Sequence, residues 1–284
     1  MSYIYNSTKR ITAIIFFLLI LCATNTAYSD SLLSIHFIDV GDGDSTLILL
    51  HSGENILIDV GSPSAGPRVA QYLKSVGIKE INHLILTHSH YDHIGGIFSI
   101  LSKFDVLNYY DNGFSNFGSD IYRDYIKLVR KDLSKYKILQ AGESLRFNDI
   151  RIEVLNPLLP PTGNINTDSI VLKVIYGEVK ILLAGDMGQL GERRFLNLKT
   201  DLRSQILKVA HHGEDDSTSD DFLKSIKPEE AIISISEVDI YARPHPAVIN
   251  RLKQAGTRIH RTDLNGNIVL RTDGKTYSIE TEKQ

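Results

Sequence analysis

Cysteine and tryptophan are almost absent from this chain of 284 residues, which has one cysteine, Cys22, and no tryptophan. A single cysteine excludes an internal disulfide framework and a zinc site built from several thiolates. An excess of charge is also missing, because 31 basic and 34 acidic residues leave a formal net charge of −3. The sequence therefore excludes a wholly basic nucleic-acid-coating protein, but it does not exclude a local basic groove.

The chain also lacks a hydrophobic run long enough to span a bilayer. The apolar stretch at residues 11–22 is shorter than the roughly 20 residues of a membrane-spanning helix. It follows Lys9 and Arg10, and small residues precede Asp30. This pattern predicts a signal peptide over residues 1–29, cleaved before Asp30, and a secreted or periplasmic protein without a membrane span. An uncleaved membrane anchor is the alternative.

Residues 30–284 are expected to form one domain, because no Pro/Gly/Ser-rich linker and no internal repeat divides them. Short β-rich runs alternate with helical patterns, and the runs at 32–40, 46–50 and 56–60 indicate an antiparallel meander. The longest predicted helix covers residues 120–136. The other predicted strands are 83–87, 150–155, 170–176, 179–184, 206–210, 231–236, 258–262, 267–272 and 276–280, and the other helices are 69–76, 189–198, 219–226 and 247–254, with one more from about residue 95.

Metal-binding residue types are concentrated directly after the strand at 83–87. His88, His90, Asp92 and His93 place four such side chains within six residues. His88 and His90 are two apart in an extended loop and point the same way, as two ligands of one ion must. Asp92 and His93 come one turn later and do not easily reach the same ion. The spacing therefore predicts two adjacent sites, and imidazole with carboxylate suits Zn, Mn or Fe.

This motif resembles that of the metallo-β-lactamase fold superfamily. The resemblance implies that His88 and His90 bind a first metal ion and that Asp92 and His93 bind a second. It further implies that Asp186, in the Gly-Asp that ends a hydrophobic strand, bridges the two ions. The α/β fold expected from this resemblance is an αββα sandwich of two mixed β-sheets flanked by helices. Asp59, in Ile-Asp-Val-Gly, matches a buried aspartate that supports the metal loop.

Further segments resemble one branch of that superfamily, the hydrolase domain of ComEC competence proteins. Residues 37–44 match its Asp-Val-Gly-x-Gly-Asp opening, and residues 207–213 match its Lys-Val-x-His-His-Gly segment. Residues 166–169, 241–246 and 261–263 continue the similarity in order. The likeness covers residues 33–280, so this chain looks like a stand-alone exported relative. Secreted phosphorylcholine esterases share much of this layout.

The chain departs from the superfamily pattern at three places. The sequence has no histidine between His93 and His211, where other members have a ligand, and Asn166 stands in that region. Three acidic residues, 214–216, follow the His-His-Gly segment and would repel a phosphate backbone. Arg243 occupies a position that is often histidine, and His245, the candidate general acid, comes two residues later.

His211 and His212 are adjacent, so at most one of them easily faces the metal ions. The likeness to phosphorylcholine esterases assigns His212 to the second metal, and His211 then lies beside the substrate as an acid or oxyanion donor. Asp92, His211, Asn166 and His245 are accordingly the candidate catalytic residues. His88, His90, Asp92, His93, Asp186 and His212 are the candidate ligands of two divalent ions, Zn or Mn.

The predicted activity is that of a secreted phosphodiesterase, of which a nuclease is one form. Two metal ions lower the pKa of a shared water and stabilise the oxygens of an in-line displacement, which suits phosphoester hydrolysis through a dinuclear metal-bound hydroxide. The expected substrate is a phosphodiester in nucleic acid or in a phosphocholine-bearing polymer. One alternative is a hydrolase of amides, lactones or thioesters, including β-lactams. The other is a metal-bearing binding module without turnover.

Overall fold

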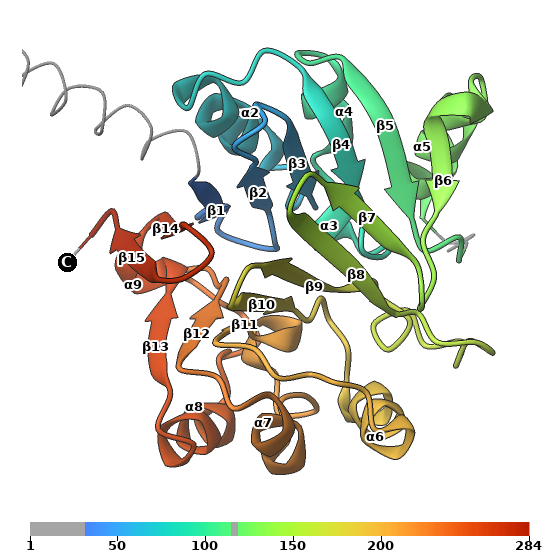
Figure 1. Ribbon diagram of the computed structural model, residues 1–284. Coiled ribbons are helices and arrows are strands. Elements are labelled where there is room, and N and C mark those ends of the chain that lie inside the picture. The colour runs from blue at the N-terminus through green and yellow to red at the C-terminus, as the bar shows by residue number, and fades with distance from the viewer. Residues whose placement is uncertain (1–31, 115–118, 284) are drawn as a thin grey trace, which may run out of the picture.

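The computed structural model describes residues 32–114 and 119–283 (Figure 1). The predicted signal peptide, residues 1–29, lies outside the described residues. Within them, two β-sheets pack face to face and helices cover the outer face of each sheet. This arrangement confirms the predicted αββα sandwich.

Both sheets mix parallel and antiparallel strands. The first sheet contains, in spatial order, β15 (Tyr277–Thr281), β14 (Ile268–Thr272), β1 (Leu33–Phe37), β2 (Thr46–Leu49), β3 (Asn55–Ile58), β4 (Ile81–Ile85), β5 (Val106–Asp111) and β6 (Tyr136–Ile138). The second contains β13 (Arg258–Arg261), β12 (Glu230–Ile233), β11 (Ile206–Lys208), β10 (Val179–Leu183), β9 (Val171–Tyr176), β8 (Ile150–Asn156) and β7 (Ser144–Phe147). The predicted meander is confirmed, because β1, β2 and β3 pair antiparallel.

Helices form the two outer layers. They are α2 (Gly66–Ser75), α3 (Tyr91–Ile94), α4 (Ile97–Leu101), α5 (Asp120–Val129), α6 (Gln189–Leu198), α7 (Asp220–Ile226), α8 (Pro246–Gln254) and α9 (Thr262–Asn265), with 3-10 turns η1 (Leu133–Lys135) and η2 (Ala210–Gly213). Apolar residues of α2, α4 and α5 pack on the first sheet, and those of α6, α7 and α8 pack on the second. None of the helices in the described ranges is long and apolar enough to cross a membrane.

Apolar and polar side chains alternate along β1, and this alternation decides which face of the strand is packed against the other sheet. Leu33, Ile35 and Phe37 are buried between the two sheets, whereas Ser34 and His36 lie on the opposite face, toward α2. Successive side chains of a strand point to opposite faces, so one strand supplies both layers. The central core between the sheets therefore holds the ends of the strands, and the loops after them, in fixed positions.

The predicted helix over residues 120–136 is wrong in its second half. The helix ends at Val129, and a 3-10 turn leads directly into strand β6. The carboxylate of Asp132 accepts a hydrogen bond from the backbone N–H of Ser134, which favours the turn over further helix. Tyr136 then pairs with Tyr109 of β5 in parallel register. Pairing with a distant strand thus overrides the helical spacing of the apolar residues.

Candidate metal centre

The loop after β4 and the helix α3 that follows it carry four of the predicted metal ligands. His88 and His90 lie before α3, and the backbone of His90 is extended (φ −72°, ψ 151°). Asp92 and His93 occupy the first turn of α3. All of these side chains except that of His90 belong to buried residues. The change from extended chain to helix between His90 and Asp92 directs the two pairs of side chains differently.

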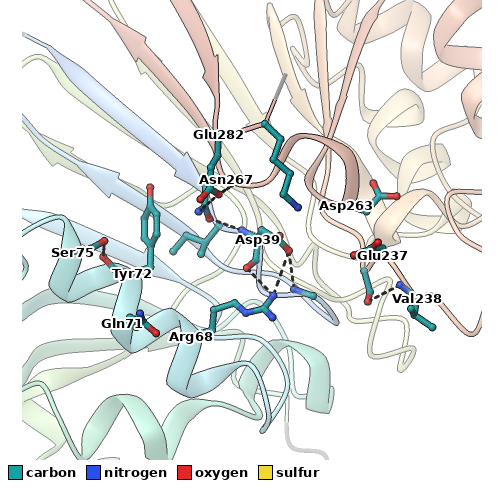
Figure 2. A pocket seen from close by; sticks show the side chains of 14 residues that line it. Asp39, Arg68, Gln71, Tyr72, Ser75, Glu237, Val238, Asp263, Asn267 and Glu282 are labelled. Carbon is teal, nitrogen blue, oxygen red and sulfur yellow. Dashed lines mark hydrogen bonds and ion pairs between the residues drawn. The ribbon is translucent and has the colours of Figure 1, made fainter.

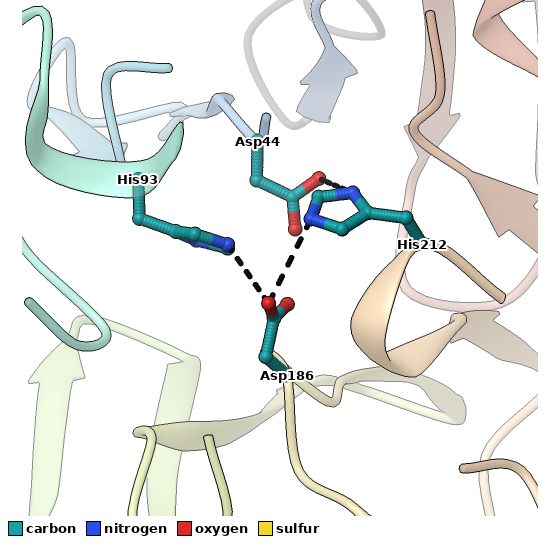
Figure 3. A group of neighbouring side chains, drawn as sticks. All are labelled: Asp44, His93, Asp186 and His212. Carbon is teal, nitrogen blue, oxygen red and sulfur yellow. Dashed lines mark hydrogen bonds and ion pairs between the residues drawn. The ribbon is translucent and has the colours of Figure 1, made fainter. Parts of the chain in front are cut away.

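Two loops of the second sheet bring Asp186 and His212 to the same place. Asp186 follows β10, and His212 lies in η2 directly after β11. Since β10 and β11 are parallel neighbours, their following loops meet at one edge of the sheet. Figure 3 shows His93, Asp186 and His212 facing one another, with Asp44 alongside.

The Asp186 carboxylate lies between the imidazoles. Its Oδ2 atom is 3.1 Å from His93 Nε2 and 3.7 Å from both His88 Nε2 and His212 Nε2. On one side, His88 Nε2 is 3.1 Å from His90 Nδ1. The structure therefore places Asp186 where a carboxylate shared by two groups of ligands would lie.

Asp92 belongs to the other side of Asp186. Its Oδ2 atom is 3.4 Å from His212 Nε2 and 3.9 Å from His93 Nε2. The five predicted ligands other than Asp186 thus lie in two groups around its carboxylate, with His88 and His90 in one and Asp92, His93 and His212 in the other.

The donor atoms of this cluster fit divalent metal ions. Asp186 Oδ1 and His212 Nε2 are buried and have no hydrogen-bond partner in the part of the chain that the structure describes. Buried polar atoms normally have partners, and a metal ion is one such partner. Imidazole nitrogens and carboxylate oxygens are the ligands preferred by Zn and suit Mn as well.

The charge balance of the cluster also favours cations. Asp44, Asp59 and Asp186 are buried, and burial alone would raise the pKa of each carboxyl. Burial is outweighed at Asp186, where His93 and His212 hold the pKa well below its ordinary value. An ionised, buried carboxylate among imidazoles requires positive charge close by.

The pKa values of His88 and His93 shift in opposite directions because their neighbours differ. Burial lowers the pKa of His88 well below its ordinary value, and the nearby His93 lowers it further, which favours the neutral imidazole that a metal ion requires. Burial also disfavours charge on His93, but Asp186, Asp59 and Asp92 outweigh it and raise the pKa of His93 well above its ordinary value.

Asp59 lies behind His93, on the side away from the cluster. Its Oδ2 atom is 2.8 Å from His93 Nδ1 and accepts a 2.7 Å hydrogen bond from the hydroxyl of Thr87. Its Oδ1 atom accepts a 2.8 Å hydrogen bond from the backbone N–H of Thr87. When a metal ion takes the place of the proton on Nε2, a carboxylate on Nδ1 keeps the hydrogen on that nitrogen and orients the ring.

The adjacent histidines 211 and 212 point in different directions, and both backbones are left-handed, with φ of 51° and 54°. His212 Nδ1 donates to the carbonyl oxygen of Ser234 over 3.0 Å, and its Nε2 faces the cluster. His211 instead lies 3.1 Å from the side chain of Asn166 and 2.9 Å from that of Asp216. Burial lowers the pKa of His211, but Asp216 and Asp186 outweigh it, so the net direction is upward.

A cavity of about 470 Å³ opens beside the cluster. Its walls include His90, Asp92, Asn166, His211 and Arg243. Three of the four candidate catalytic residues therefore border one cavity, together with a ligand of each predicted metal.

The fourth candidate catalytic residue, His245, does not line this cavity. Its side chain is half exposed and caps α8, where its Nδ1 accepts a 3.3 Å hydrogen bond from the backbone N–H of Ala247. Arg243 reaches the cavity instead, because Asp239 holds its guanidinium through a 2.8 Å ion pair.

A second cavity, of about 690 Å³, lies outside this site (Figure 2). It is bordered by α2, the loop after β1 and the end of the chain. Its polar side chains are largely bonded to one another: Arg68 lies 3.7 Å from Asp39, and Asn267 donates to Glu282 over 2.7 Å. None of the predicted site residues lines it.

Two residues near the cluster were not assigned from the sequence. Asp44 lies with His93, Asp186 and His212 in a group whose ligand atoms are all within 4.8 Å of one another. Lys208 forms a 2.8 Å ion pair with Asp44, and both side chains are buried. Both residues belong to segments that carried the resemblance to competence proteins, so the segments pointed to this region although neither residue was singled out.

The sequence model of a protein family, described as the metallo-beta-lactamase superfamily, matches residues 38–237 of this chain. The chain belongs to the metallo-beta-lactamase superfamily. The matched range includes every predicted metal ligand. Members of this superfamily are typically hydrolases.

Proteins of bacterial competence are similar to most of this chain. ComE operon protein 3 of Bacillus subtilis is 30% identical over 265 residues, which are 86% of this chain and 34% of that protein. Recombination protein 2 of Haemophilus influenzae is 30% identical over 81% of this chain and 28% of its own length. Competence protein ComA of Neisseria gonorrhoeae is 28% identical over 80% of this chain and 30% of its own length. The chain spans about a third of the length of these relatives, and the predicted likeness to competence proteins is confirmed.

Solved structures share the fold at low sequence identity. The metallo-beta-lactamase fold protein YhfI from Bacillus subtilis has a TM-score of 0.55 at 14% identity and covers 85% of this chain and 100% of its own. CmlA, a diiron beta-hydroxylase from Streptomyces venezuelae, has a TM-score of 0.57 at 16% identity and covers 84% of this chain and 54% of its own. These likenesses concern the arrangement of sheets and helices.

Proposed function

We propose that this protein is a metal-dependent phosphodiesterase that holds two divalent ions, Zn or Mn. The observation that carries the proposal is the Asp186 carboxylate, which has His88 and His90 on one side and Asp92, His93 and His212 on the other. Two metal ions held there would supply a nucleophile at neutral pH and would stabilise the charged oxygens of a phosphoryl group.

The remaining residues of the cavity have roles of their own in this proposal. Asn166 and His211 are joined by a 3.1 Å contact and stand beside Asp92, where they would bind the phosphate oxygens or the leaving group. Arg243 places a fixed positive charge at the same wall, because its ion pair with Asp239 holds the guanidinium still. Preorganised donors of this kind stabilise charge that develops during a displacement.

Two observations bear on the kind of phosphodiester. Relatives named for competence and recombination favour nucleic acid as the substrate and a nuclease as the activity. Glu214 and Asp216 also line the cavity, however, and their charges would repel the continuing backbone of a long polyanion. A phosphodiester with a short or uncharged flank, including one in a phosphocholine-bearing polymer, would avoid that repulsion.

The test is a substrate screen of the purified protein loaded with Mn or Zn. The substrates are bis-p-nitrophenyl phosphate, p-nitrophenylphosphorylcholine, single- and double-stranded DNA, and nitrocefin. We expect hydrolysis of at least one phosphodiester by the wild type and by Asp221→Ala, an exposed residue of α7 that pairs only with Lys224 among the described ion pairs.

Two outcomes would replace the proposal with its alternatives. Cleavage of nitrocefin without cleavage of any phosphodiester would indicate an amide or lactone hydrolase. Stoichiometric metal binding with no hydrolysis of any of these substrates would indicate a binding module.

We further propose that the protein is exported and that residues 1–29 are removed. The support is the order of charges, apolar residues and small residues before Asp30. Cell fractionation followed by N-terminal sequencing tests this. A chain that begins at Asp30 in the periplasmic or secreted fraction is expected, whereas a membrane-bound chain that retains the segment would identify an anchor.

A further inference from the structure

Asp44 and Lys208 form a buried ion pair between the two sheets. Asp44 lies in the loop between β1 and β2, and Lys208 is the last residue of β11. Lys208 Nζ is 2.8 Å from Asp44 Oδ2, and the side chains are only 3% and 8% exposed. Moving two charges out of water costs several kcal/mol per ion, and replacing such a pair by apolar residues often stabilises a protein. The pair is therefore better explained by what it positions than by stability.

The other oxygen of Asp44 faces His212. Asp44 Oδ1 has no hydrogen-bond partner within the described ranges and lies 3.7 Å from His212 Nδ1 (Figure 3). The same nitrogen donates to the carbonyl oxygen of Ser234 over 3.0 Å. Two acceptors thus lie around Nδ1 and favour a hydrogen on that nitrogen. The lone pair of Nε2 is then directed toward Asp92 and Asp186.

This arrangement resembles the one at His93, where the carboxylate lies closer and forms a hydrogen bond. There the Asp59 carboxylate lies 2.8 Å from Nδ1, and Nε2 faces Asp186. Both imidazoles on this side of Asp186 therefore have a carboxylate near Nδ1, at 2.8 Å for His93 and at 3.7 Å for His212. Carboxylates in this position orient a ligating histidine and raise its basicity.

The backbone of Asp44 also contacts the loop that carries the other ligands. Its N–H donates to the carbonyl oxygen of Asp92 over 3.1 Å, and its own carbonyl accepts from Gly61 over 2.9 Å. Because Lys208 lies four residues before His212, the ion pair connects the loop bearing Asp92 with the loop bearing His212. These loops come from different sheets.

We propose that Asp44, held in place by Lys208, is a positioning residue that orients His212 as a ligand of the second metal ion. The inference rests on the proposed metal centre. It predicts that the charge of Asp44 affects metal binding and not only folding.

The experiment compares Asp44→Asn with a matched control, Asp201→Asn. Asp201 also pairs with a buried lysine, because its carboxylate is 3.0 Å from Nζ of Lys173, but it lies outside the metal cluster. Affinity for both Zn ions is measured by chelator competition. Asp44→Asn should weaken one of the two ions roughly 10- to 100-fold, and Asp201→Asn should leave both unchanged.

A double variant separates positioning from folding. Asp44→Asn combined with Lys208→Met removes both buried charges. Without metal, we expect this double variant to melt at the temperature of the metal-free wild type. Its metal affinity should stay below that of the wild type. Recovery of wild-type affinity in the double variant would overturn the proposal, as would wild-type affinity in Asp44→Asn.

Lys208→Met alone tests whether Asp44 is itself a ligand. Positioning predicts weaker binding, because the carboxylate loses its anchor, whereas a carboxylate freed to bind the ion directly would give tighter binding and overturn the proposal. A wild type that binds fewer than two Zn ions would instead contradict the proposed metal centre, so the two failures are distinguishable.

Discussion

At the scale of single residues, the position of Asp186 decides what this site can do. One oxygen of its carboxylate lies within 3.7 Å of three imidazole nitrogens, and the other oxygen has no hydrogen-bond partner among the residues described. Among the ion pairs of the described residues, His88 is paired with Asp186 alone. The loss of Asp186 should therefore affect both groups of ligands, whereas the loss of any one histidine should affect one group.

Asp186→Ala is expected to lose both metal ions and all metal-dependent hydrolysis. The reason is that each group of imidazoles loses the anionic ligand that completes it. Elemental analysis after metal reconstitution should fall from two equivalents in the wild type to fewer than one. His88→Ala serves as the comparison and should retain one ion, bound by Asp92, His93 and His212. Retention of two ions by Asp186→Ala would refute the shared role.

Asn166 should respond in the opposite way when it becomes histidine. Its amide is 3.1 Å from His211, and its Oδ1 is buried without a hydrogen bond within the described residues. If Asn166 stands where other superfamily members have a ligand, the imidazole of Asn166→His should tighten the first metal ion. Chelator competition measures this, with Asn166→Ala as the control that keeps both ions but slows turnover about 10- to 100-fold. Unchanged affinity in Asn166→His would place the missing ligand elsewhere.

At the scale of elements, short loops after strands carry the chemistry and depend on close backbone contacts. The loop between β1 and β2 touches the loop after β4 so closely that Asp44 and Asp92 share a backbone hydrogen bond of 3.1 Å. A Cβ atom at Gly43 would lie 1.8 Å from the carbonyl oxygen of Asp92, and the φ of Gly43 is +105°. A glycine is required there for both reasons.

Gly43→Ala should destabilise the protein far more than a matched glycine substitution. Gly53 has a φ of +88° but open space around the position of a Cβ. We expect Gly53→Ala to cost roughly 1–2 kcal/mol, from backbone strain alone, and Gly43→Ala to cost about 3 kcal/mol or more, because the loop must also move. Urea unfolding of the metal-free proteins measures both free energies. Equal costs would mean that the loops separate without penalty.

The contact between β1 and α2 should make stability depend on pH. His36 lies between the hydroxyls of Ser34 and Tyr72, at 2.9 and 2.8 Å, and burial lowers its pKa to about 4, with a smaller contribution from Arg271. The unfolded chain, with a pKa of about 6.5, binds a proton in this range that the folded chain does not. Stability is therefore present above about pH 6.5 and is lost as the pH falls toward 4.

The measurement is the unfolding free energy of the metal-free protein between about pH 4.5 and 6.5. In the wild type this energy should rise with pH by up to about 1.4 kcal/mol per unit more than in His36→Gln. Parallel pH profiles would show that His36 becomes protonated without unfolding.

At the scale of the whole molecule, the cluster connects the two sheets. His88, His90, Asp92 and His93 come from the first sheet, and Asp186 and His212 come from the second. Elsewhere the sheets meet through an apolar core and through the buried ion pair of Asp44 with Lys208. A metal ion bound by ligands from both halves would oppose their separation.

Metal loading should therefore raise the melting temperature. A ligand that binds only the folded state at 100 times its dissociation constant stabilises by about 2.7 kcal/mol, which corresponds to roughly 5–10 °C for a domain of this size. Differential scanning calorimetry with Zn and then with excess chelator measures the shift. Asp186→Ala should show no shift, and an equal shift in that variant would indicate metal binding elsewhere.

Much of the site could be predicted because its residues are close together in the chain. His88, His90, Asp92 and His93 lie within six residues, and local backbone geometry alone separates them into two pairs. The strand before them and the alternation in β1 likewise follow from local hydrophobic periods. The prediction of a helix through residue 136 was wrong, because the partner of that segment is β5, which periodicity within the segment does not reveal.

Other features depended on tertiary structure because they join distant segments. The directions of the His211 and His212 side chains depend on contacts with distant segments, Asn166 for His211 and Ser234 for His212. The ion pair of Asp44 with Lys208 spans 164 positions and forms only when the sheets pack. A sequence determines by itself which residues can bind a metal and how neighbours within a turn are directed. Packing of the two sheets decides which distant side chains complete the site, since contacts across that interface leave no periodic trace in either segment.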